Sequence, residues 1–250
     1  MNSTIRIGVA GAMGRMGRVA TEVVEASAGL AVAARFGRPG PAEEDLAGCD
    51  VIVDFTTAAA SIALAARAAA SGRPALVIGS TGFSAAEEEA VRAASAKIAI
   101  VKSGNFSIGA TILGALVEQT AAKLGRKDWD IEIVEAHHRL KRDAPSGTAL
   151  MLARAAADGR GEALGAIAVR GRDGMTGPRS EGAIGFSVLR GGGIVGEHAV
   201  VFAAEDEILT LAHSARDRRL FARGAVTAAI WVAGRGPGLY NMTDVLGVRN

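Results

Sequence analysis

The sequence has few cysteines, few aromatic residues and little net charge. Its 250 residues include one cysteine, Cys49, which excludes an internal disulfide and is typical of a reducing compartment. Aromatic residues make up 4%, too few for a protein that stacks single-stranded bases, and a net charge of +2 does not favour a nucleic-acid surface. The apolar runs are too short or too interrupted to span a bilayer, and no signal segment precedes the first of them. We therefore expect a cytoplasmic protein that binds neither nucleic acid nor membrane, with an aliphatic core and a buried Cys49.

The first hundred residues alternate between strand and helix patterns. Continuous apolar runs that alternate with helices are typical of a parallel sheet covered on both faces. The pattern predicts a Rossmann-type doubly wound α/β fold. We expect strands at 4–10, 30–36, 51–56, 74–82 and 98–105, and helices at 14–28, 57–72 and 84–97.

The pattern changes after Asn105. The later strands are separated by glycine-rich or charged turns, which predicts a second α+β domain with an open, mostly antiparallel sheet. We expect helices at 107–125, 146–159 and 217–235, and strands at 129–138, 166–171, 182–192, 193–204 and 207–215. The final helix is expected to pack on the first domain. The predicted division is a dinucleotide-binding domain of residues 1–106 and 217–250, and a substrate-binding and oligomerisation domain of residues 107–216.

A glycine-rich turn follows the first predicted strand. Gly11, Gly14 and Gly17 have the spacing G-x-x-G-x-x-G and lead into a helix. Residues without a Cβ permit a tight turn and a close approach of pyrophosphate to the helix N-terminus, where Arg15 adds positive charge. The alternative is that these glycines serve only close packing of strand and helix. The position after the first strand favours a dinucleotide site.

The end of the second strand bears on the choice of cofactor. An acid that bonds the ribose hydroxyls of NAD is usual there, but this chain has Gly37 and Arg38. Arg35 and Arg38 are suited to a 2′-phosphate, so the sequence favours NADPH, with NADH possible. The alternative is that both arginines are ordinary exposed charges.

Three further strands end in polar residues. Ligands of open α/β sheets bind beyond the carboxyl ends of the strands, so the turns Gly79–Gly82 and Ser103–Ser107 are expected to face the nicotinamide. Asp54 either lines the same site or caps the following helix, and capping is the favoured interpretation.

The segment EAHHRLKRDAPSGTAL, residues 135–150, concentrates polar chemistry. His137 and His138 end a predicted strand, so their side chains are expected to diverge. Lys141 follows, and a helix begins near Ser146, with Asp143 or Ser146 as its cap. A histidine, a cation and a helix N-terminus suit acid–base chemistry on a carboxylate. Diverging histidines without further patterned ligands do not favour a metal site, and so polar a loop does not favour buried core histidines.

This segment resembles the signature of the dihydrodipicolinate reductase family, now also called the 4-hydroxy-tetrahydrodipicolinate reductase family. GAMGRMGR, VIGSTGF, GNFSIGA, GFSVLRGGGIVGEH and YNMTDVLG resemble the family in the same order, so the resemblance covers essentially the whole chain. It implies reduction of 4-hydroxy-tetrahydrodipicolinate, a cyclic imine dicarboxylate, to tetrahydrodipicolinate with NADPH or NADH, in the diaminopimelate route to lysine. It also implies a homotetramer whose central contact is the sheet of the second domain.

The resemblance assigns roles to residues. The catalytic positions fall on His137 and Lys141, and the substrate positions on His138, Gly147 and Thr148. No metal is implied. The cofactor positions fall on Gly11, Ala12, Met13, Gly14, Arg15, Met16, Arg38, Gly79, Ser80, Thr81, Ser103, Gly104, Asn105 and Phe106.

Two other functions compete with this interpretation. One is a different two-domain NADPH oxidoreductase that acts on an amino-acid-derived imine or aldehyde. The other is a dinucleotide sensor that binds cofactor without turnover. The carboxylate-binding character of residues 137–148 argues against both, although a dehydratase activity or an altered substrate stays open.

Overall fold

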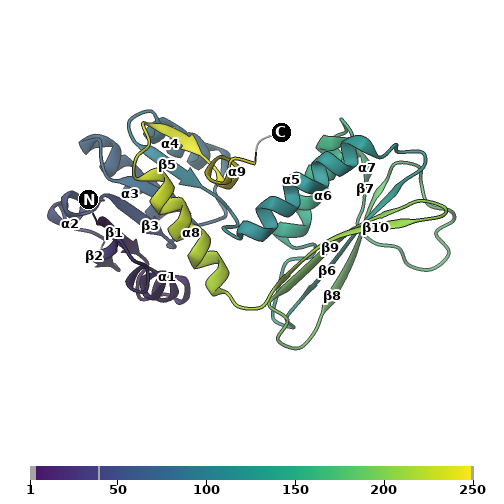
Figure 1. Cartoon of the computed structure of the whole chain (residues 1–250), viewed down its shortest axis with the longest axis horizontal. Helices are drawn as coiled ribbons and strands as arrows, with labels where there is room; N and C mark the ends of the chain where they lie inside the picture. Colours follow the sequence, from purple (N-terminus) through teal and green to yellow (C-terminus); the bar gives the residue numbers. More distant parts are fainter. Residues whose placement is uncertain (1–3, 39, 249–250) are drawn as a thin grey trace. The chain divides into compact units, whose positions relative to one another are not determined.

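The chain divides into two compact units. The computed structural model describes residues 4–38 and 40–248. Of the described residues, unit 1 comprises 4–38, 40–108 and 219–247, and unit 2 comprises 109–218 and 248. Figure 1 shows the elements of each unit.

Unit 1 is built on a six-stranded parallel sheet in the order β11-β5-β4-β3-β1-β2. The predicted parallel sheet is therefore confirmed. The strands are β1 (Ile5–Ala10), β2 (Leu30–Phe36), β3 (Val51–Asp54), β4 (Ala75–Ile78), β5 (Ala99–Lys102) and β11 (Gly238–Tyr240).

Helices cover both faces of this sheet, as continuous apolar strands require. Val9, Val53 and Val101 pack against buried residues of α1 and α8, whereas Ile52, Leu76 and Ile100 pack against those of α3 and α4. Cys49 lies in the second of these cores, fully buried, and burial raises the pKa of its thiol to about 11. The helices of unit 1 are α1 (Arg15–Glu25), α2 (Glu43–Gly48), α3 (Ala58–Ser71), α4 (Ala85–Ser95), α8 (Arg219–Val232) and α9 (Met242–Leu246).

Capping residues fix the ends of these helices. Ser84 begins α4 with a capping box: its hydroxyl accepts from the Glu87 amide, and the Glu87 carboxylate accepts from the Ser84 amide. Gly72 ends α3 in the left-handed conformation. Both ends agree with the predicted boundaries. By contrast, the helix expected at 217–235 is not the last element, because β11 and α9, which like α8 belong to unit 1, follow it.

Unit 2 has a five-stranded sheet in the order β10-β9-β6-β8-β7. The expected antiparallel pairing holds on one side of β6, where β6 pairs with β9 and β9 with β10. On the other side, β8 pairs in parallel with both β6 and β7, so the sheet is mixed. Parallel pairing of β6 with β8 follows from the long helical connection between them. The elements are α5 (Ile108–Lys123), β6 (Asp130–His137), α6 (Gly147–Gly159), α7 (Leu164–Ile167), β7 (Ala168–Val169), β8 (Ile184–Arg190), β9 (Gly196–Ala203) and β10 (Ile208–Ala215).

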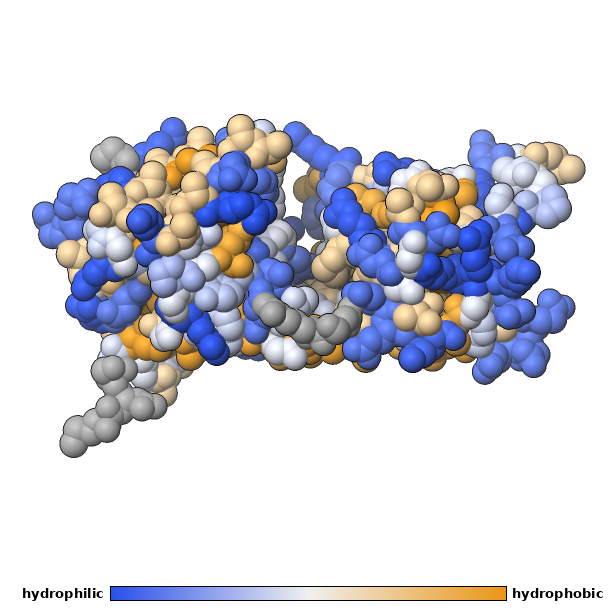
Figure 2. Space-filling model, turned by 90° about the horizontal axis from the view of Figure 1, so that it is seen from above, coloured by the Kyte–Doolittle hydropathy of each residue, from blue (hydrophilic) through white to orange (hydrophobic). Residues whose placement is uncertain are grey.

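The two faces of this second sheet differ. Ile131, Ile133 and Phe202 are buried against α5 and α6. Alternate residues point to the opposite face, where Val134 is 42% exposed and Ile208 69% exposed. A single exposed apolar residue is common on protein surfaces and needs no explanation. Several exposed apolar residues on one face of a sheet are typical of an interaction surface. Figure 2 shows hydrophobic residues in separate patches among hydrophilic ones on one side of the molecule.

The helices give no sign of a membrane-spanning segment. Among residues 4–38 and 40–248, no helix combines the length and the apolar character that crossing a bilayer requires.

Candidate active site

The glycine turn between β1 and α1 forms a close-fitting backbone loop. Gly11 has φ +77°, which disfavours any residue with a Cβ. A Cβ on Gly17 would lie 2.1 Å from the Gly11 carbonyl oxygen, so the first turn of α1 packs directly on the loop. The Gly11 and Ala12 amides both donate to the Phe36 carbonyl at 3.1 Å, which ties the loop to the end of β2.

The N-terminus of α1 is suited to an anion. Its N-cap is Gly14, which has no side chain to bond the first amides of the helix. Arg15 and Met13 are exposed beside this helix start, whereas Ala12 is buried and Met16 is half-buried. A backbone loop without Cβ atoms that leads into an uncapped helix fits a dinucleotide pyrophosphate.

The two arginines at the end of β2 differ. Arg35 forms an ion pair with Glu25 of α1. Arg38 is exposed in the turn after the strand. Of the two, Arg38 is the better placed to meet a phosphate group.

The turns after β4 and β5 lie at one edge of the sheet, because these parallel strands are neighbours. Gly79 and Ser80 follow β4 directly, and a Cβ on Gly79 would lie 2.4 Å from the Phe55 ring. Thr81 is exposed. After β5, the Ser103 hydroxyl donates to the Asn105 carbonyl at 2.6 Å, Gly104 is exposed, and the Phe106 ring contacts Phe55 edge to face.

Asp54 does not cap α3, so the favoured interpretation was wrong. The cap is Thr57, whose hydroxyl accepts from the Ala60 amide. Asp54 is fully buried and accepts from the Thr56 amide and hydroxyl and, at 2.6 Å, from the Ser61 hydroxyl. Ser61 Oγ lies 2.6 Å from Ser80 Oγ, so Asp54 connects through Ser61 to a residue assigned to the cofactor. Burial raises the pKa of Asp54, against the opposing effect of these bonds.

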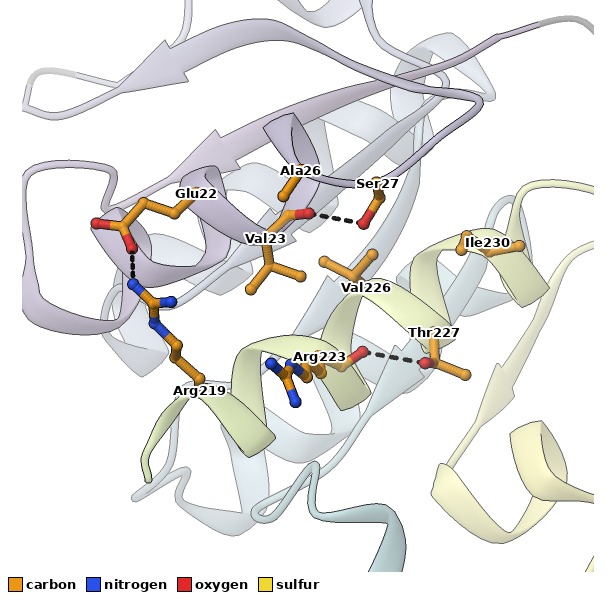
Figure 3. A pocket seen from close by; sticks show the side chains of 9 residues that line it. All are labelled: Glu22, Val23, Ala26, Ser27, Arg219, Arg223, Val226, Thr227 and Ile230. Carbon is orange, nitrogen blue, oxygen red and sulfur yellow. Dashed lines mark hydrogen bonds and ion pairs between the residues drawn. The ribbon is translucent and has the colours of Figure 1, made fainter. Parts of the chain in front are cut away.

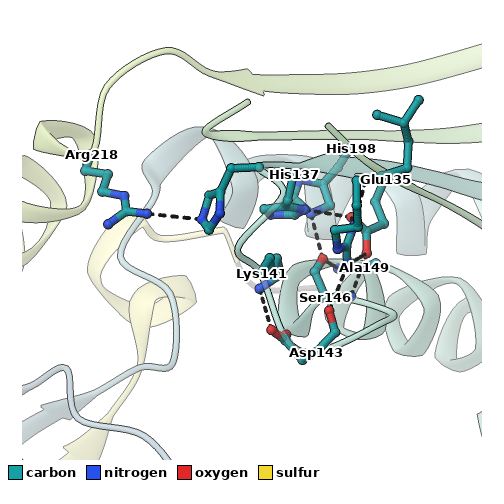
Figure 4. Close-up of polar contacts among 11 residues, drawn as sticks. Glu135, His137, Lys141, Asp143, Ser146, Ala149, His198 and Arg218 are labelled. Carbon is teal, nitrogen blue, oxygen red and sulfur yellow. Dashed lines mark hydrogen bonds and ion pairs between the residues drawn. The ribbon is translucent and has the colours of Figure 1, made fainter. Parts of the chain in front are cut away.

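In unit 2, His137 ends β6 and is buried, with 8% exposure. The expectation that polar neighbours would keep this histidine out of the interior was therefore wrong. Strand alternation turns His137 toward the face that carries Ile131 and Ile133, and polar groups surround it there. Figure 4 shows these contacts.

The central polar group is Glu135, two residues before His137. Its side chain is fully buried, and Oε2 lies 2.6 Å from His137 Nδ1. Arg190, at the end of β8, donates to both carboxylate oxygens at 2.7 and 2.8 Å. Burial raises the pKa of Glu135, but the bonds from Arg190, His137 and Ser146 outweigh it and lower the pKa.

Ser146 joins the helix start to the same network. Its amide donates to Glu135 Oε1 at 2.9 Å, and its hydroxyl caps α6 by accepting from the Ala149 amide at 3.1 Å. Of the two caps left open by the sequence, Ser146 is therefore the one used. Ser146 Oγ also lies 2.9 Å from Nε2 of His198, a buried residue of β9. Exposed Gly147 and half-buried Thr148 form the first turn of α6.

The loop after His137 holds the other predicted residues. Lys141 Nζ forms a 2.8 Å ion pair with Asp143, and the bond from Lys141 lowers the pKa of Asp143. His138 Nε2 accepts from Arg218 at 3.2 Å. The two adjacent histidines thus have different partners, in agreement with the predicted divergence.

The structure brings together groups that sequence reasoning missed. Glu135, Arg190 and His198 surround His137 but had not been proposed. A signal existed for Glu135, since a residue two positions before His137 shares its side of the strand. A second existed for His198, which follows the inward alternation of Val200 and Phe202 on β9. Arg190 comes from a distant strand and gave no local signal.

No metal site accompanies these residues. Across the described ranges, no three side chains of His, Cys, Asp or Glu are grouped as a candidate ligand set.

A cavity of about 420 Å³ in unit 1 lies away from all the predicted residues. It lies between α1 and α8, where Arg219 donates to Glu22 at 2.7 Å (Figure 3). Val23, Val226 and Ile230 make much of its wall apolar.

Two family models match nearly the whole chain. The model described as dihydrodipicolinate reductase, N-terminus, matches residues 5–106, and the one described as dihydrodipicolinate reductase, C-terminus, matches residues 109–246. A 4-hydroxy-tetrahydrodipicolinate reductase of Caulobacter vibrioides is 57% identical over the full length of both chains. One of Rhizobium rhizogenes is 47% identical over 99% of this chain and 98% of its own.

Solved structures share the fold. A dipicolinate-bound dihydrodipicolinate reductase from Paenisporosarcina sp. TG-14 has a TM-score of 0.76 at 23% identity, and the match covers 96% of this chain and 98% of the other. GenD2 of gentamicin A biosynthesis, in complex with NAD, has a TM-score of 0.59 at 17% identity, over 98% and 91% of the two chains.

Proposed function

The chain belongs to the dihydrodipicolinate reductase family, and from this premise we propose that it reduces 4-hydroxy-tetrahydrodipicolinate to tetrahydrodipicolinate with a nicotinamide cofactor. Full-length relatives of 57% and 47% identity carry that activity in their names. The product places the reaction in the diaminopimelate route to lysine.

The observation that carries the proposal is the arrangement of residues 137–148 in unit 2. A buried histidine, a lysine and the first turn of α6 follow one another within 12 residues, held together by Glu135 and Arg190. A cyclic dicarboxylate needs cations and helix amides for its two carboxylates, and it needs a proton donor for the ring. Dipicolinate, which is bound in the Paenisporosarcina structure, is a ligand of this chemical kind.

In this proposal Gly147, Thr148 and His138 hold the substrate carboxylates. Lys141 supplies a cation beside the ring, for which it leaves Asp143, and His137 supplies the proton. Loss of the ring hydroxyl as water leaves a conjugated imine. Reduction at the same carbon moves electron density toward the ring nitrogen, and protonation of the resulting enamine completes the reaction.

His137 must gain a proton before it acts as an acid. Burial lowers the pKa of His137, Glu135 raises it, and Lys141 and Arg190 lower it further, so the net effect is a decrease. A bound dicarboxylate brings negative charge close to the ring and raises the histidine pKa again. Substrate binding therefore favours the protonated form at the step that needs it.

The cofactor residues belong to unit 1. Gly11 to Met16 hold the pyrophosphate, and Gly79 to Thr81 and Ser103 to Phe106 line the nicotinamide side. The close fit of Gly17 on Gly11 and the glycine N-cap of α1 support this role. The bound nicotinamide supplies hydride. Hydride transfer requires the substrate ring to be aligned with the nicotinamide and water to be excluded.

NADPH is the proposed form of the cofactor. Gly37 stands where an acid would bond the ribose hydroxyls, and Arg38 is exposed in the same turn. Because Arg35 is paired with Glu25, we assign the 2′-phosphate contact to Arg38.

A homotetramer in the cytoplasm completes the proposal. One face of the second sheet exposes the large apolar side chains of Val134, Leu189 and Ile208 among polar ones, which supports a contact between subunits. Light scattering after size exclusion tests the assembly. The proposed cytoplasmic location is supported by the single, buried cysteine, which is typical of a protein from a reducing compartment. Cell fractionation tests this location.

The decisive experiment supplies the unstable substrate in place. Dihydrodipicolinate synthase, pyruvate and aspartate semialdehyde are mixed with NADPH and this protein. The proposal predicts loss of NADPH absorbance that depends on both proteins. Cofactor binding without turnover would instead support the sensor function, and turnover of other imines or aldehydes would support a different oxidoreductase.

A further inference from the structure

We infer that Glu135 is a positioning residue that fixes the proton of neutral His137 on Nδ1 and so reserves Nε2 for proton transfer to the substrate. The catalytic part of this inference rests on the proposed function. The tautomer part stands on the geometry of unit 2 alone.

The carboxylate of Glu135 is saturated with donors. Oε1 accepts from Arg190 Nη2 at 2.8 Å and from the Ser146 amide at 2.9 Å. Oε2 accepts from Arg190 Nη1 at 2.7 Å and lies 2.6 Å from His137 Nδ1. Three of these four partners, the two Arg190 nitrogens and the Ser146 amide, can only donate. The bidentate ion pair with Arg190, which lowers the pKa of Glu135, keeps the carboxylate ionised, so it is an acceptor toward His137 as well.

An ionised acceptor decides the tautomer of its histidine partner. A ring nitrogen 2.6 Å from a carboxylate must carry the hydrogen, so neutral His137 is protonated on Nδ1 and has its lone pair on Nε2. When the ring takes up a second proton, that proton enters at Nε2. The atom that gives and receives protons is thereby specified by the fold.

The surroundings of Nε2 are consistent with this role. A Cβ on Gly196 of β9 would lie only 3.1 Å from Nε2, so the glycine keeps this nitrogen uncrowded. The neighbouring ring of His198 lies 5.1 Å away, centroid to centroid, and bonds Ser146 instead of His137. The charged groups around His137 are Glu135, Lys141 and Arg190, with Asp143 on the far side of Lys141.

Glu135 also connects the parts of the proposed site to one another. Through Arg190, which donates to the Asp143 carbonyl at 2.7 Å, it fixes the loop that holds Lys141. Through the Ser146 amide it fixes the first turn of α6. One buried ion pair thus sets the positions of the histidine, the lysine and the helix N-terminus together. Removing one partner of such a pair leaves a buried charge, so the substitution must conserve shape.

The test begins with the free protein. The chain has four histidines, so ring nitrogen-15 labelling gives few signals to assign. At a pH where His137 is neutral, we expect a protonated Nδ1 and an unprotonated Nε2. In Glu135→Gln the amide oxygen takes the Oε1 position, where two donors, Arg190 Nη2 and the Ser146 amide, require an acceptor, so the NH₂ group takes the Oε2 position facing His137 and Arg190 Nη1. The hydrogen then moves to Nε2. Glu132→Gln is the matched control, since Glu132 lies on the same strand and also pairs with arginines, Arg172 and Arg179.

Two nitrogen results would overturn the inference. One is a wild-type His137 with its hydrogen on Nε2, and the other is an unchanged Nδ1–H tautomer in a folded Glu135→Gln variant. Both nitrogen-15 results can be obtained whether or not the protein is catalytically active. The tautomer and the proposed reaction are therefore judged separately.

Kinetics test the catalytic part. Glu135→Gln is expected to lower kcat on the order of 10²-fold or more, with a smaller effect on KM. Loss of the carboxylate also lowers the pKa of His137, so the fall of kcat/KM with rising pH begins at lower pH. The double variant Glu135→Gln, His137→Gln should be no slower than His137→Gln alone. A further loss of 10-fold or more in the folded double variant would show that Glu135 acts on turnover through the Lys141 loop or α6 and not through His137 alone, which would overturn the catalytic part of the inference.

Discussion

Ser146 Oγ lies 2.9 Å from His198 Nε2, which joins the N-cap of α6 to strand β9 through a buried imidazole. Burial lowers the pKa of His198 to about 4 from 6.5. The unfolded chain therefore binds a proton on His198 at a higher pH than the folded chain does. This contribution to stability is complete above pH 6.5 and is lost as the pH falls toward 4.

The first prediction concerns this pH dependence. A difference of about 2.5 pKa units corresponds to about 3 kcal/mol of unfolding free energy. His198→Gln retains an amide that can bond Ser146 but does not titrate, so its unfolding free energy should fall less between pH 6.5 and 4. Urea unfolding at several pH values measures both proteins. Parallel curves would show that His198 is not the residue responsible. The difference in unfolding free energy between the two proteins should not change between pH 7 and 8.

The second prediction separates catalysis from cofactor binding. His137→Gln and Lys141→Ala remove the proposed acid and cation from unit 2, whereas the proposed cofactor residues lie in unit 1. Turnover should fall by roughly 10²- to 10⁴-fold. The NADPH dissociation constant, measured by fluorescence, should change less than 3-fold by our estimate, about 0.6 kcal/mol. Wild-type turnover in either variant would remove that residue from the mechanism.

Much of this architecture was predictable from local patterns. The parallel strands of unit 1 are continuous apolar runs between helices, and Ser84 and Gly72 mark helix ends by their own chemistry. Each of these signals lies within a few residues of the element that it marks. β11 has three residues, too few for a periodic pattern, and its pairing with β5 joins parts of the chain far apart in sequence.

The site was predictable only where its residues are neighbours in sequence. His137, Lys141 and Ser146 stand in one segment, so their type and spacing indicated acid–base chemistry. The state of His137 depends on Arg190 and His198, which come from β8 and β9. Strand register brings them together, and register is not encoded near His137. The role of Asp54 was misjudged for a similar reason. Its partner Ser61 also bonds Ser80, which follows a different strand, and the sequence around Asp54 does not indicate that contact.

The third prediction concerns cofactor choice. Arg38→Ala removes the proposed partner of the 2′-phosphate, a charged hydrogen bond worth about 1.5–3 kcal/mol. NADPH affinity should fall about 10- to 100-fold, with little change for NADH. Arg35→Ala is the matched control, because Arg35 is paired with Glu25 and should affect both cofactors equally. Equal losses for both cofactors in Arg38→Ala would rule out a contact with the 2′-phosphate.

The fourth prediction concerns the buried carboxylate of unit 1. Asp54 accepts from Thr56 and Ser61, and because the single hydroxyl hydrogen of Ser61 goes to Asp54, Ser80 must donate to Ser61. Asp54→Asn places an NH₂ group where Asp54 accepts from Ser61, so Ser61 must accept from it and donate to Ser80 instead. The expected cost of replacing the charged acceptor is about 1–3 kcal/mol of unfolding free energy. Because the Ser80 hydroxyl must then accept where it donated before, its orientation changes and cofactor affinity should fall as well.

Thr57→Ala supplies the comparison that identifies the role of Asp54. Thr57 is the N-cap of α3, so its loss should cost about 1 kcal/mol of stability but leave Ser80 in place. Ser61→Ala should behave like Asp54→Asn, because Ser61 bonds both Asp54 and Ser80. Unfolding in urea and cofactor titration by fluorescence are measured on all three variants. If Thr57→Ala weakens cofactor binding as much as Asp54→Asn does, general loosening of α3 is the cause. If only the Asp54 and Ser61 variants lose affinity, the buried carboxylate orients the turn after β4.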